Sequence, residues 1–384
     1  MTSKIFHQID QLFPSYIKFW EDICNIESPT AHKAGVDAVG AYAADAARAH
    51  GWKVETFPQP VSGDVVCITM NEDAKGTPIA LSGHMDTVHP LGAFGSPAVR
   101  IEGDTIYGPG VSDCKGGIAE AFLVMDALEK SGYRERPILL LLQSDEEGGS
   151  KGSAKATIRY MCEKAVGCAA FLNLESQSGD RICVARKGII SFTYKIYGIE
   201  AHSSICDKAG ASAILEAAHK IIELEKLKDG DGLTCNCGVI SGGTVPNTVP
   251  GYCEFKANIR FVNEEQLEWV KEYVKKIADT VYVKGCRCEV EQLGERVAME
   301  EKPVNLELAT KINAAFEKAG LSTFSTFRGT GGSDAADVTV FGKTPCVDNL
   351  GVRGSFIHSP NERAKIESLR EMAKRLAAII CHLE

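Results

Sequence analysis

The most constraining feature of the sequence is Pro137–Leu142, a run of strand length in which no side chain is polar. A strand without a polar face has to be covered on both sides, as in the parallel sheets of α/β proteins. The short runs Pro78–Leu81 and Ala169–Leu174 are also predicted strands. We therefore expect an α/β domain whose mixed, largely parallel sheet carries helices on both faces.

Each predicted strand is followed by groups that can do chemistry. His84 and Asp86 follow the strand Pro78–Leu81. Asp145, Glu146 and Glu147 follow Pro137–Leu142, and Glu175 follows Ala169–Leu174. The carboxyl ends of the strands are where open α/β sheets bind ligands. Because His84 and Asp86 are two residues apart, their side chains point the same way, and a carboxylate beside an imidazole can fix a metal-binding ring. Of two adjacent carboxylates, one can bind a metal while the other acts as general base.

Two more candidate groups occupy predicted loops. Asp113 lies between Gly110 and Gly116, just before an apolar-periodic helix, and flanking glycines allow a loop to aim a carboxylate. A helix-capping Asp would explain Asp113 alone, but not the glycines on both sides. His358 precedes the last predicted helix. Three acidic groups and two histidines thus lie at the ends of predicted elements. A shared site for two zinc ions explains these positions better than five independent coincidences do.

Charge and hydropathy narrow the possible partners. The chain has 384 residues and a formal net charge of -9, with no block of Lys and Arg, so no nucleic-acid partner is expected. No apolar stretch approaches the roughly 20 residues of a membrane span, so no membrane partner is expected either. The amino terminus lacks the apolar core of a secretory signal, which predicts a cytoplasmic protein.

The 14 cysteines are scattered through predicted helices and strands, which is typical of reduced, buried thiols rather than of a disulfide scaffold. Two Cys-x-Cys pairs, Cys235/Cys237 and Cys286/Cys288, each share a predicted strand face. A structural zinc site there is disfavoured, because such sites usually place two to four residues between ligands.

The amino-terminal segment predicts an amphipathic helix, because apolar residues recur at three- and four-residue spacing from Ile5 to Ile26. Pro14 lies within this pattern and lacks the N–H that continues a helix. A break or kink is therefore expected at Pro14.

The middle of the chain predicts a separate unit. Its expected elements are a strand at 188–197, a helix at 211–227, strands at 234–241 and 251–261, a helix at 263–283 and a strand at 287–293. This β-α-β-β-α-β order is the ferredoxin-like pattern. We therefore expect a first domain formed by residues 1–186 and 297–384, interrupted by an inserted ferredoxin-like α+β domain at 187–296.

Five motifs follow one another along the chain: His84-Met-Asp86-Thr, Tyr107-Gly-Pro-Gly-Val-Ser-Asp113-Cys-Lys-Gly-Gly, Asp145-Glu-Glu-Gly-Gly, Glu175, and His358-Ser-Pro-Asn-Glu362. Together they resemble the zinc-dependent aminoacylase and carboxypeptidase family of dinuclear metallopeptidases. That family includes bacterial glutamate carboxypeptidase, acetylornithine deacetylase, succinyl-diaminopimelate desuccinylase and peptidase T. The likeness spans nearly the whole chain, and Tyr107–Gly110 is most similar to the glutamate carboxypeptidase branch.

The resemblance implies a zinc-exopeptidase-like catalytic domain with two Zn²⁺ ions that share Asp113. It implies that His84 and Glu175 are the other ligands of one ion. It implies that Glu147 and His358 are the other ligands of the second ion. Glu146 would be the general base, and Asp86 the partner of His84. One departure is Ser176, which stands where the family often has proline.

The resemblance also implies that the inserted domain at 187–296 is a lid, in which His202 donates a hydrogen bond to the oxyanion. It also implies a substrate-carboxylate clamp made of Asn247, Arg260, Arg328, Gly331 and Gly332. Arginine suits this task because its planar fork pairs with both carboxylate oxygens. The glycine-rich loop after Arg328 lacks the Gly-Lys-Ser/Thr ending of nucleotide loops. Family members often dimerise through the lid, so a homodimer is expected.

The predicted function is hydrolysis of an amide bond next to a free carboxylate, by a metallo-exopeptidase that acts on small peptides as a carboxypeptidase or a di- or tripeptidase. The alternative is an N-acyl amino acid deacylase, which uses the same chemistry. A non-catalytic binding protein is disfavoured, because all five ligand positions and the position of the base are filled. Cobalt or manganese could replace zinc, since geometry and availability select the metal.

Overall fold

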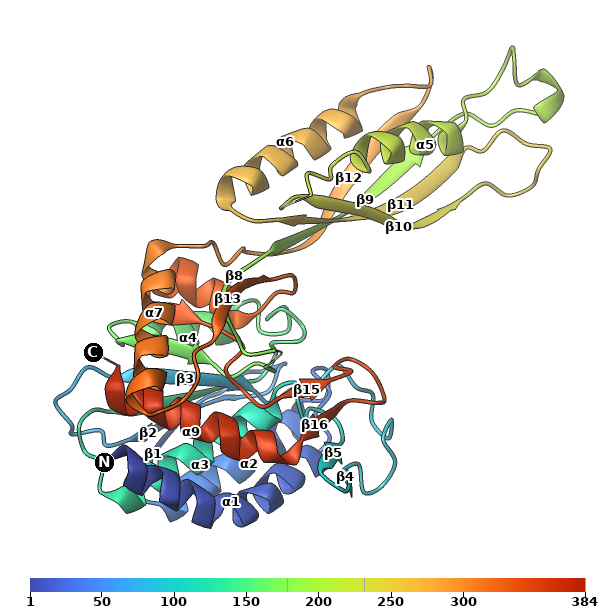
Figure 1. Cartoon of the computed structure of the whole chain (residues 1–384). Helices are drawn as coiled ribbons and strands as arrows, with labels where there is room; N and C mark the ends of the chain where they lie inside the picture. Colours follow the sequence, from blue (N-terminus) through green and yellow to red (C-terminus); the bar gives the residue numbers. More distant parts are fainter. Residues whose placement is uncertain (178, 231, 384) are drawn as a thin grey trace. The chain divides into compact units, whose positions relative to one another are not determined.

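A computed structural model describes residues 1–177, 179–230 and 232–383 (Figure 1). The chain folds into two compact units. The first comprises Met1–Ala185, Glu301–Arg328 and Ser333–Glu384, and the second comprises Arg186–Glu300 with the segment Gly329–Gly332. This segment was expected in the first domain. It belongs with the second unit because its carbonyl oxygens accept hydrogen bonds from Arg186 and Arg260.

The centre of the first unit is a six-stranded sheet with the order β1-β2-β6-β3-β7-β14. Its strands are β1 (Lys53–Phe57), β2 (Val65–Met70), β3 (Ile79–His84), β6 (Ile138–Gln143), β7 (Ala170–Asn173) and β14 (Cys346–Val347). β3 runs parallel to β6 and β7, and β14 runs parallel to β7, whereas β1 and β2 are antiparallel to their neighbours. The expected mixed sheet is confirmed. Every residue of β3 and β7 is buried, which explains their apolar composition.

Helices cover both faces of this sheet, and Figure 1 shows α3 and α4 on opposite sides of it. The helices of the first unit are α1 (Thr2–Asn25), α2 (Lys33–Ala49), α3 (Lys115–Ser131), α4 (Ala156–Ala165), α7 (Pro303–Lys318), α8 (Asp334–Asp337) and α9 (Ile366–His382). The helix α1 continues through Pro14, so a break there is wrong, while a kink stays a prediction. Ile9 and Trp20 on either side of Pro14 are fully buried, and this packing stabilises both halves of the helix.

The helical layer also fixes the loop that leads into α3. The indole N–H of Trp20 donates a hydrogen bond to the backbone oxygen of Val111 at 3.1 Å. A Cβ on Gly116 would lie 2.4 Å from the Val352 side chain, and one on Gly117 would lie 2.2 Å from the backbone oxygen of Leu174. Close packing therefore requires both glycines.

A second, antiparallel sheet of the first unit has the order β15-β16-β5-β4. Its strands are β4 (Arg100–Glu102), β5 (Thr105–Tyr107), β15 (Gly354–Ser355) and β16 (Arg363–Lys365), while β8 (Arg181–Arg186) pairs separately with β13 (Ser325–Gly329). The strands β15 and β16 form a hairpin whose loop, residues 356–362, carries His358.

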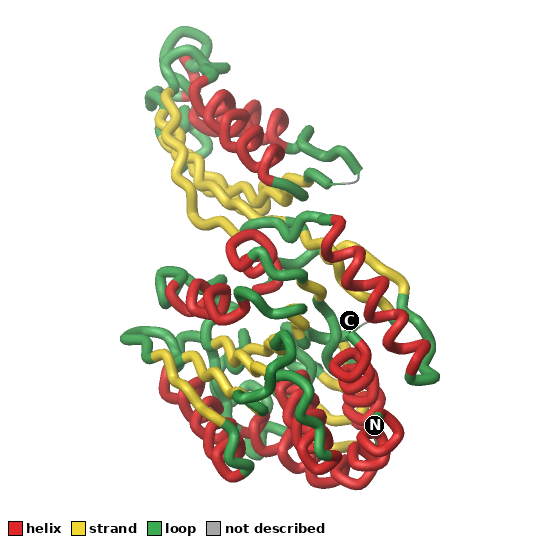
Figure 2. The backbone as a smooth tube through the Cα atoms, turned by 90° about the vertical axis from the view of Figure 1, so that its left-hand side faces the viewer, coloured by secondary structure: helices red, strands yellow, loops and turns green. Residues whose placement is uncertain are grey.

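The second unit is an antiparallel sheet with two helices on one face (Figures 1 and 2). In chain order its elements are β9 (Gly188–Tyr197), α5 (Ala213–Leu224), β10 (Thr234–Gly242), β11 (Tyr252–Phe261), α6 (Glu264–Asp279) and β12 (Arg287–Arg296). This order is the ferredoxin-like pattern. Its core includes Tyr194 and Phe255, which stack with ring centroids 4.7 Å apart. No helix in the described ranges of either unit has both the length and the apolar character that a bilayer crossing requires.

Candidate active site

His84 is the last residue of β3 and is buried. Its Nε2 lies 3.0 Å from Asp113 Oδ1 and 3.7 Å from Glu175 Oε1. Its Nδ1 lies 3.0 Å from the backbone oxygen of Asp86. A carbonyl oxygen only accepts hydrogen bonds, so in the neutral ring Nδ1 carries the proton and Nε2 presents its lone pair to the two carboxylates.

Asp113 offers its two carboxylate oxygens to two different histidines. Oδ1 faces His84, and Oδ2 lies 3.2 Å from His358 Nε2. Burial acts to raise the pKa of Asp113, but hydrogen bonds with His358 and His84 outweigh it and hold that pKa well below its usual range. A carboxylate in this position suits a ligand that two cations share.

His358 reaches the same place from the loop between β15 and β16. Its Nε2 lies 3.2 Å from Glu147 Oε2. Hydrogen bonds with Asp113 and Glu147 raise the pKa of His358 to about 10, and burial raises the pKa of Glu147 to about 7. The structure thus brings together residues from the turn after β6 and from the carboxyl-terminal hairpin.

Glu175, two residues beyond β7, completes the group around His84. Burial raises the pKa of Glu175 well above its ordinary value. Cys114, to which sequence reasoning assigned no role, also lies here, and the donor atoms of His84, Cys114 and Glu175 are within 4.8 Å of one another. The Cys114 thiol donates to the backbone oxygen of Leu174 at 3.1 Å.

The five predicted ligands bring three carboxyl groups and two imidazoles into one cluster. Burial by itself lowers the pKa of His84, but Cys114, Asp113 and Asp86 raise it well above its ordinary value. Imidazole nitrogens and carboxylate oxygens are donors that Zn²⁺ accepts, and Co²⁺ and Mn²⁺ also bind such groups. The donor set fits two divalent cations that share Asp113.

Asp86 fixes the acidic turn after β6 as well as His84. Its Oδ1 accepts the backbone N–H of Glu146 at 3.2 Å, and its Oδ2 accepts the backbone N–H of Glu147 at 3.1 Å. The hydroxyl of Thr30 also donates to Oδ2, at 2.7 Å. Glu146 is buried beside this cluster, at 5% exposure. Asp86 Oδ1 also lies 3.4 Å from His84 Nδ1, so one carboxylate contacts His84 and the backbone of both glutamates.

Two further buried residues belong to the site although no role was predicted for them. Glu362 accepts the backbone N–H groups of Ser112 and Asp113, and its other oxygen lies 2.7 Å from His89 Nε2. Glu362 ends the motif that begins at His358, and His89 lies three residues after Asp86. Nearness to a predicted site residue was the only sequence signal that could have indicated a role for His89 or Glu362.

The second unit holds His202 and four of the predicted substrate residues. The backbone N–H of Ser203 donates to the backbone oxygen of Asn247 at 3.0 Å, so His202 and Asn247 lie on adjacent segments. Arg260 Nη1 donates to the backbone oxygen of Thr330 at 3.2 Å, beside Gly331 and Gly332.

Arg328 differs from these residues in that it belongs to the first unit. Its Nη2 lies 3.6 Å from Glu301 Oε2. Sequence reasoning also missed two arginines of the second unit. Arg186 Nη1 donates to the backbone oxygen of Gly331 at 3.3 Å, and a Cβ on Gly332 would lie 3.0 Å from Arg296.

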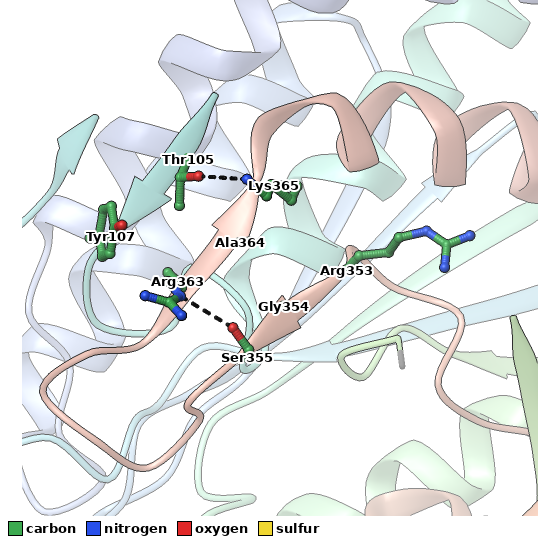
Figure 3. A pocket seen from close by; sticks show the side chains of 8 residues that line it. All are labelled: Thr105, Tyr107, Arg353, Gly354, Ser355, Arg363, Ala364 and Lys365. Carbon is green, nitrogen blue, oxygen red and sulfur yellow. Dashed lines mark hydrogen bonds between the residues drawn. The ribbon is translucent and has the colours of Figure 1, made fainter. Parts of the chain in front are cut away.

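A separate cavity of about 400 Å³ lies at the base of the hairpin that carries His358 (Figure 3). In Figure 3, Arg363 points toward Ser355 and Lys365 toward Thr105, whereas Arg353 points away from them. Arg353 is paired with Asp180 and Glu371, and Lys365 with Asp104. None of the predicted site residues lines this cavity, so it is distinct from the candidate active site.

Residues 80–382 match the model of Peptidase family M20/M25/M40. The chain belongs to this family. Among its M20 relatives, carboxypeptidase G2 of Pseudomonas sp. (strain RS-16) is 27% identical over 370 residues, which cover 94% of this chain and 87% of that protein. Succinyl-diaminopimelate desuccinylase of Rickettsia akari (strain Hartford) is 27% identical over 282 residues, which cover 68% and 73%.

Solved structures show the same M20 fold. Aminopeptidase PepT from Bacillus cereus ATCC 10987 matches with a TM-score of 0.80 at 24% identity, covering 97% of this chain and 98% of that one. A tripeptidase from Staphylococcus aureus matches with a TM-score of 0.79 at 22% identity, covering 96% and 97%. The predicted family and fold are confirmed. The protein is a metal-dependent hydrolase of the peptidase and amidohydrolase class.

Proposed function

We propose that this M20 enzyme is a zinc-dependent exopeptidase that cleaves the amide bond next to a free carboxylate, as a carboxypeptidase or a di- or tripeptidase. The observation that carries the proposal is the position of Asp113, whose two oxygens face the Nε2 atoms of His84 and His358. His84 with Glu175, and His358 with Glu147, are the proposed further ligands of the two ions.

When bound, the two cations would lower the pKa of a water molecule and polarise the scissile carbonyl. Glu146 is the proposed general base, because Asp86 fixes its backbone beside Glu147. In this role Glu146 takes a proton from the attacking water and passes it to the leaving amine. Asp86 supports the reaction by holding His84 in the tautomer that directs Nε2 to the ligand cluster.

His202 is proposed to stabilise the oxyanion. Its Nδ1 accepts the backbone N–H of Ser204 at 3.2 Å, so in the neutral ring the proton is on Nε2. The side chain is exposed, which leaves this N–H able to donate to a substrate. A hydrogen-bond donor aimed at a developing oxyanion contributes strongly to catalysis of acyl transfer.

Arg260 and the loop at Gly331–Gly332 are proposed to hold the substrate carboxylate, together with Asn247 and Arg328. Burial lowers the pKa of Arg260, but a guanidinium remains charged in proteins. The contact of Arg260 with Thr330 places a cationic fork beside the glycines. The nearby Arg186 and Arg296 add positive charge to the same loop.

Deacylation of N-acyl amino acids is the second candidate, because one relative is a succinyl-diaminopimelate desuccinylase. A panel of dipeptides, tripeptides and N-acetyl and N-succinyl amino acids separates the two. The peptidase proposal predicts that the highest kcat/KM belongs to a peptide, and a higher value for an acylated amino acid would replace it with deacylation.

Glu146→Gln tests the mechanism. Glutamine keeps the size of the side chain but cannot accept the proton, so kcat should fall by at least about 100-fold. Metal content, measured by mass spectrometry, should remain that of the wild type. Glu163→Gln, on the exposed side of α4, is the control and should keep full activity. Near-normal turnover by Glu146→Gln would remove Glu146 from the mechanism.

A homodimer formed through the second unit is also proposed. The strand β10 is an edge strand of its sheet, and it exposes Val239 and Ile240. An edge strand with exposed apolar side chains is a ready surface for pairing with a second copy.

We further propose a cytoplasmic location. Burial raises the pKa values of many of the thiols, for example Cys24 to about 12 and Cys67 to about 11. Such buried thiols are typical of proteins that stay in a reducing compartment. Fractionation of cells that produce the protein tests this location.

A further inference from the structure

The loop that carries Asp113 is held by a carboxylate that lies outside the predicted ligand set. Glu362 Oε1 accepts the backbone N–H of Ser112 at 2.9 Å and that of Asp113 at 3.0 Å. Glu362 is fully buried. A buried carboxylate is costly unless hydrogen bonds satisfy it, so these two amides and Glu362 stabilise one another.

The second oxygen of Glu362 has a partner of its own. Glu362 Oε2 lies 2.7 Å from His89 Nε2. A carboxylate oxygen accepts, so His89 donates from Nε2. His89 is itself 6% exposed, and its ring packs edge-on against Phe94 with centroids 4.9 Å apart. The position of Glu362 is therefore fixed on both sides.

These contacts join three segments that each carry part of the site. His89 follows His84 and Asp86 in one segment, Glu362 follows His358 in another, and Asp113 lies in the third. The backbone N–H of Glu362 donates to the backbone oxygen of Ser359 at 3.0 Å, which ties it to the turn next to His358. A shift of Glu362 would thus move His358 and the amides of Asp113 together.

We propose that His89 and Glu362 form a positioning pair that sets the orientation of the Asp113 carboxylate and so the spacing of the two cations. Neither side chain touches the ligand atoms. Their effect passes through the backbone amides at 112 and 113 and through the 358–362 turn. The inference rests on the proposed function, because it concerns the same pair of ions.

Metal binding to the metal-free enzyme tests the pair without any substrate. Zn²⁺ is titrated in competition with a chromophoric chelator. We expect His89→Ala to weaken binding of at least one of the two ions by about 10- to 100-fold, the usual cost of removing a group that orients a ligand. His89→Gln, whose amide can donate to Glu362, should restore most of the affinity.

Ser368→Ala is the matched structural control. Its hydroxyl accepts the backbone N–H of Arg353 at 3.0 Å and donates to the backbone oxygen of Lys365 at 2.6 Å. The change therefore loosens the base of the same hairpin without touching Glu362, and it should leave both affinities at the wild-type value. Wild-type affinities for His89→Ala, or no recovery in His89→Gln, would overturn the proposal.

Should His89→Ala fail to fold, Glu362→Gln tests the same contact. Its amide nitrogen would face His89 as a donor, so the histidine would have to change tautomer. We expect the visible spectrum of the Co²⁺-loaded variant to differ from that of the wild type, and an identical spectrum would contradict the proposal. If wild-type enzyme binds no pair of ions at all, the proposed function fails instead.

Discussion

The burial of the Glu120 carboxyl group opposes the stability of the folded protein. It lies within α3 and is fully buried, and neither of its carboxyl oxygens has a hydrogen-bond partner in residues 1–177, 179–230 and 232–383. Burial raises the pKa of Glu120 well above its ordinary value of 4.5. The folded protein therefore keeps this carboxyl protonated to a higher pH than the unfolded chain does.

Glu120→Gln should stabilise the protein at pH 8 more than at pH 5. Above pH 4.5 the unfolded state releases the Glu120 proton before the folded state does, so stability falls as the pH rises, by about 1.4 kcal/mol for each pH unit until the folded pKa is reached. Glutamine does not ionise, so the substitution removes this pH dependence of stability. Thermal unfolding of both proteins at the two pH values checks it, and an equal Tm difference at pH 5 and pH 8 would contradict it.

At the residue scale, the sequence predicted which side chains gather but not how they are held. His84, Glu147 and Glu175 were predictable because each lies at or just beyond the carboxyl end of a buried parallel strand. The contacts of Glu362 were not, because they join residues about 250 positions apart through the hairpin β15–β16. No local spacing encodes such a contact.

Among the elements, α5 carries a buried ion pair that faces the end of α6. Lys220 Nζ lies 3.0 Å from Glu216 Oε1, and both side chains are almost fully buried. Lys220 also donates to the backbone oxygens of Ile277, Ala278 and Thr280, at 2.6, 3.1 and 2.6 Å, at the end of α6. The lysine therefore satisfies carbonyl groups that the helix end leaves unpaired.

Lys220→Met should lower the free energy of unfolding by about 3–5 kcal/mol, because it leaves the Glu216 charge buried without its cation. Lys226→Ala breaks an exposed pair with Glu223 and should cost less than about 1 kcal/mol. Urea denaturation followed by circular dichroism measures both. Equal losses in the free energy of unfolding would show that the buried pair does not stabilise the protein more than the exposed pair does.

Element predictions succeeded where the pattern was long and failed where tertiary contacts decide. The six elements of the second unit follow the predicted order. Pro14 did not break α1, because burial of Ile9 and Trp20 outweighs one missing hydrogen bond. The two-residue strands β14 and β15 were not predicted, since so short a segment has no periodicity.

For the whole molecule, the proposed dimer predicts that a charge on the exposed edge strand β10 prevents association. Ile240→Lys places a charge on the exposed edge strand β10 and should convert the dimer to a monomer in analytical ultracentrifugation. Val166→Lys, an exposed site in the first unit, is the control and should remain dimeric. A monomeric wild type, or a variant that remains dimeric, would contradict the proposal.

Side chains from distant parts of the chain are proposed to hold two cations that share Asp113. An anomalous difference map from a crystal grown with zinc tests it most directly. We expect two peaks flanking Asp113, one beside His84 and Glu175 and the other beside Glu147 and His358. A map with no peak at Asp113, or with a single peak that His358 does not touch, would contradict it.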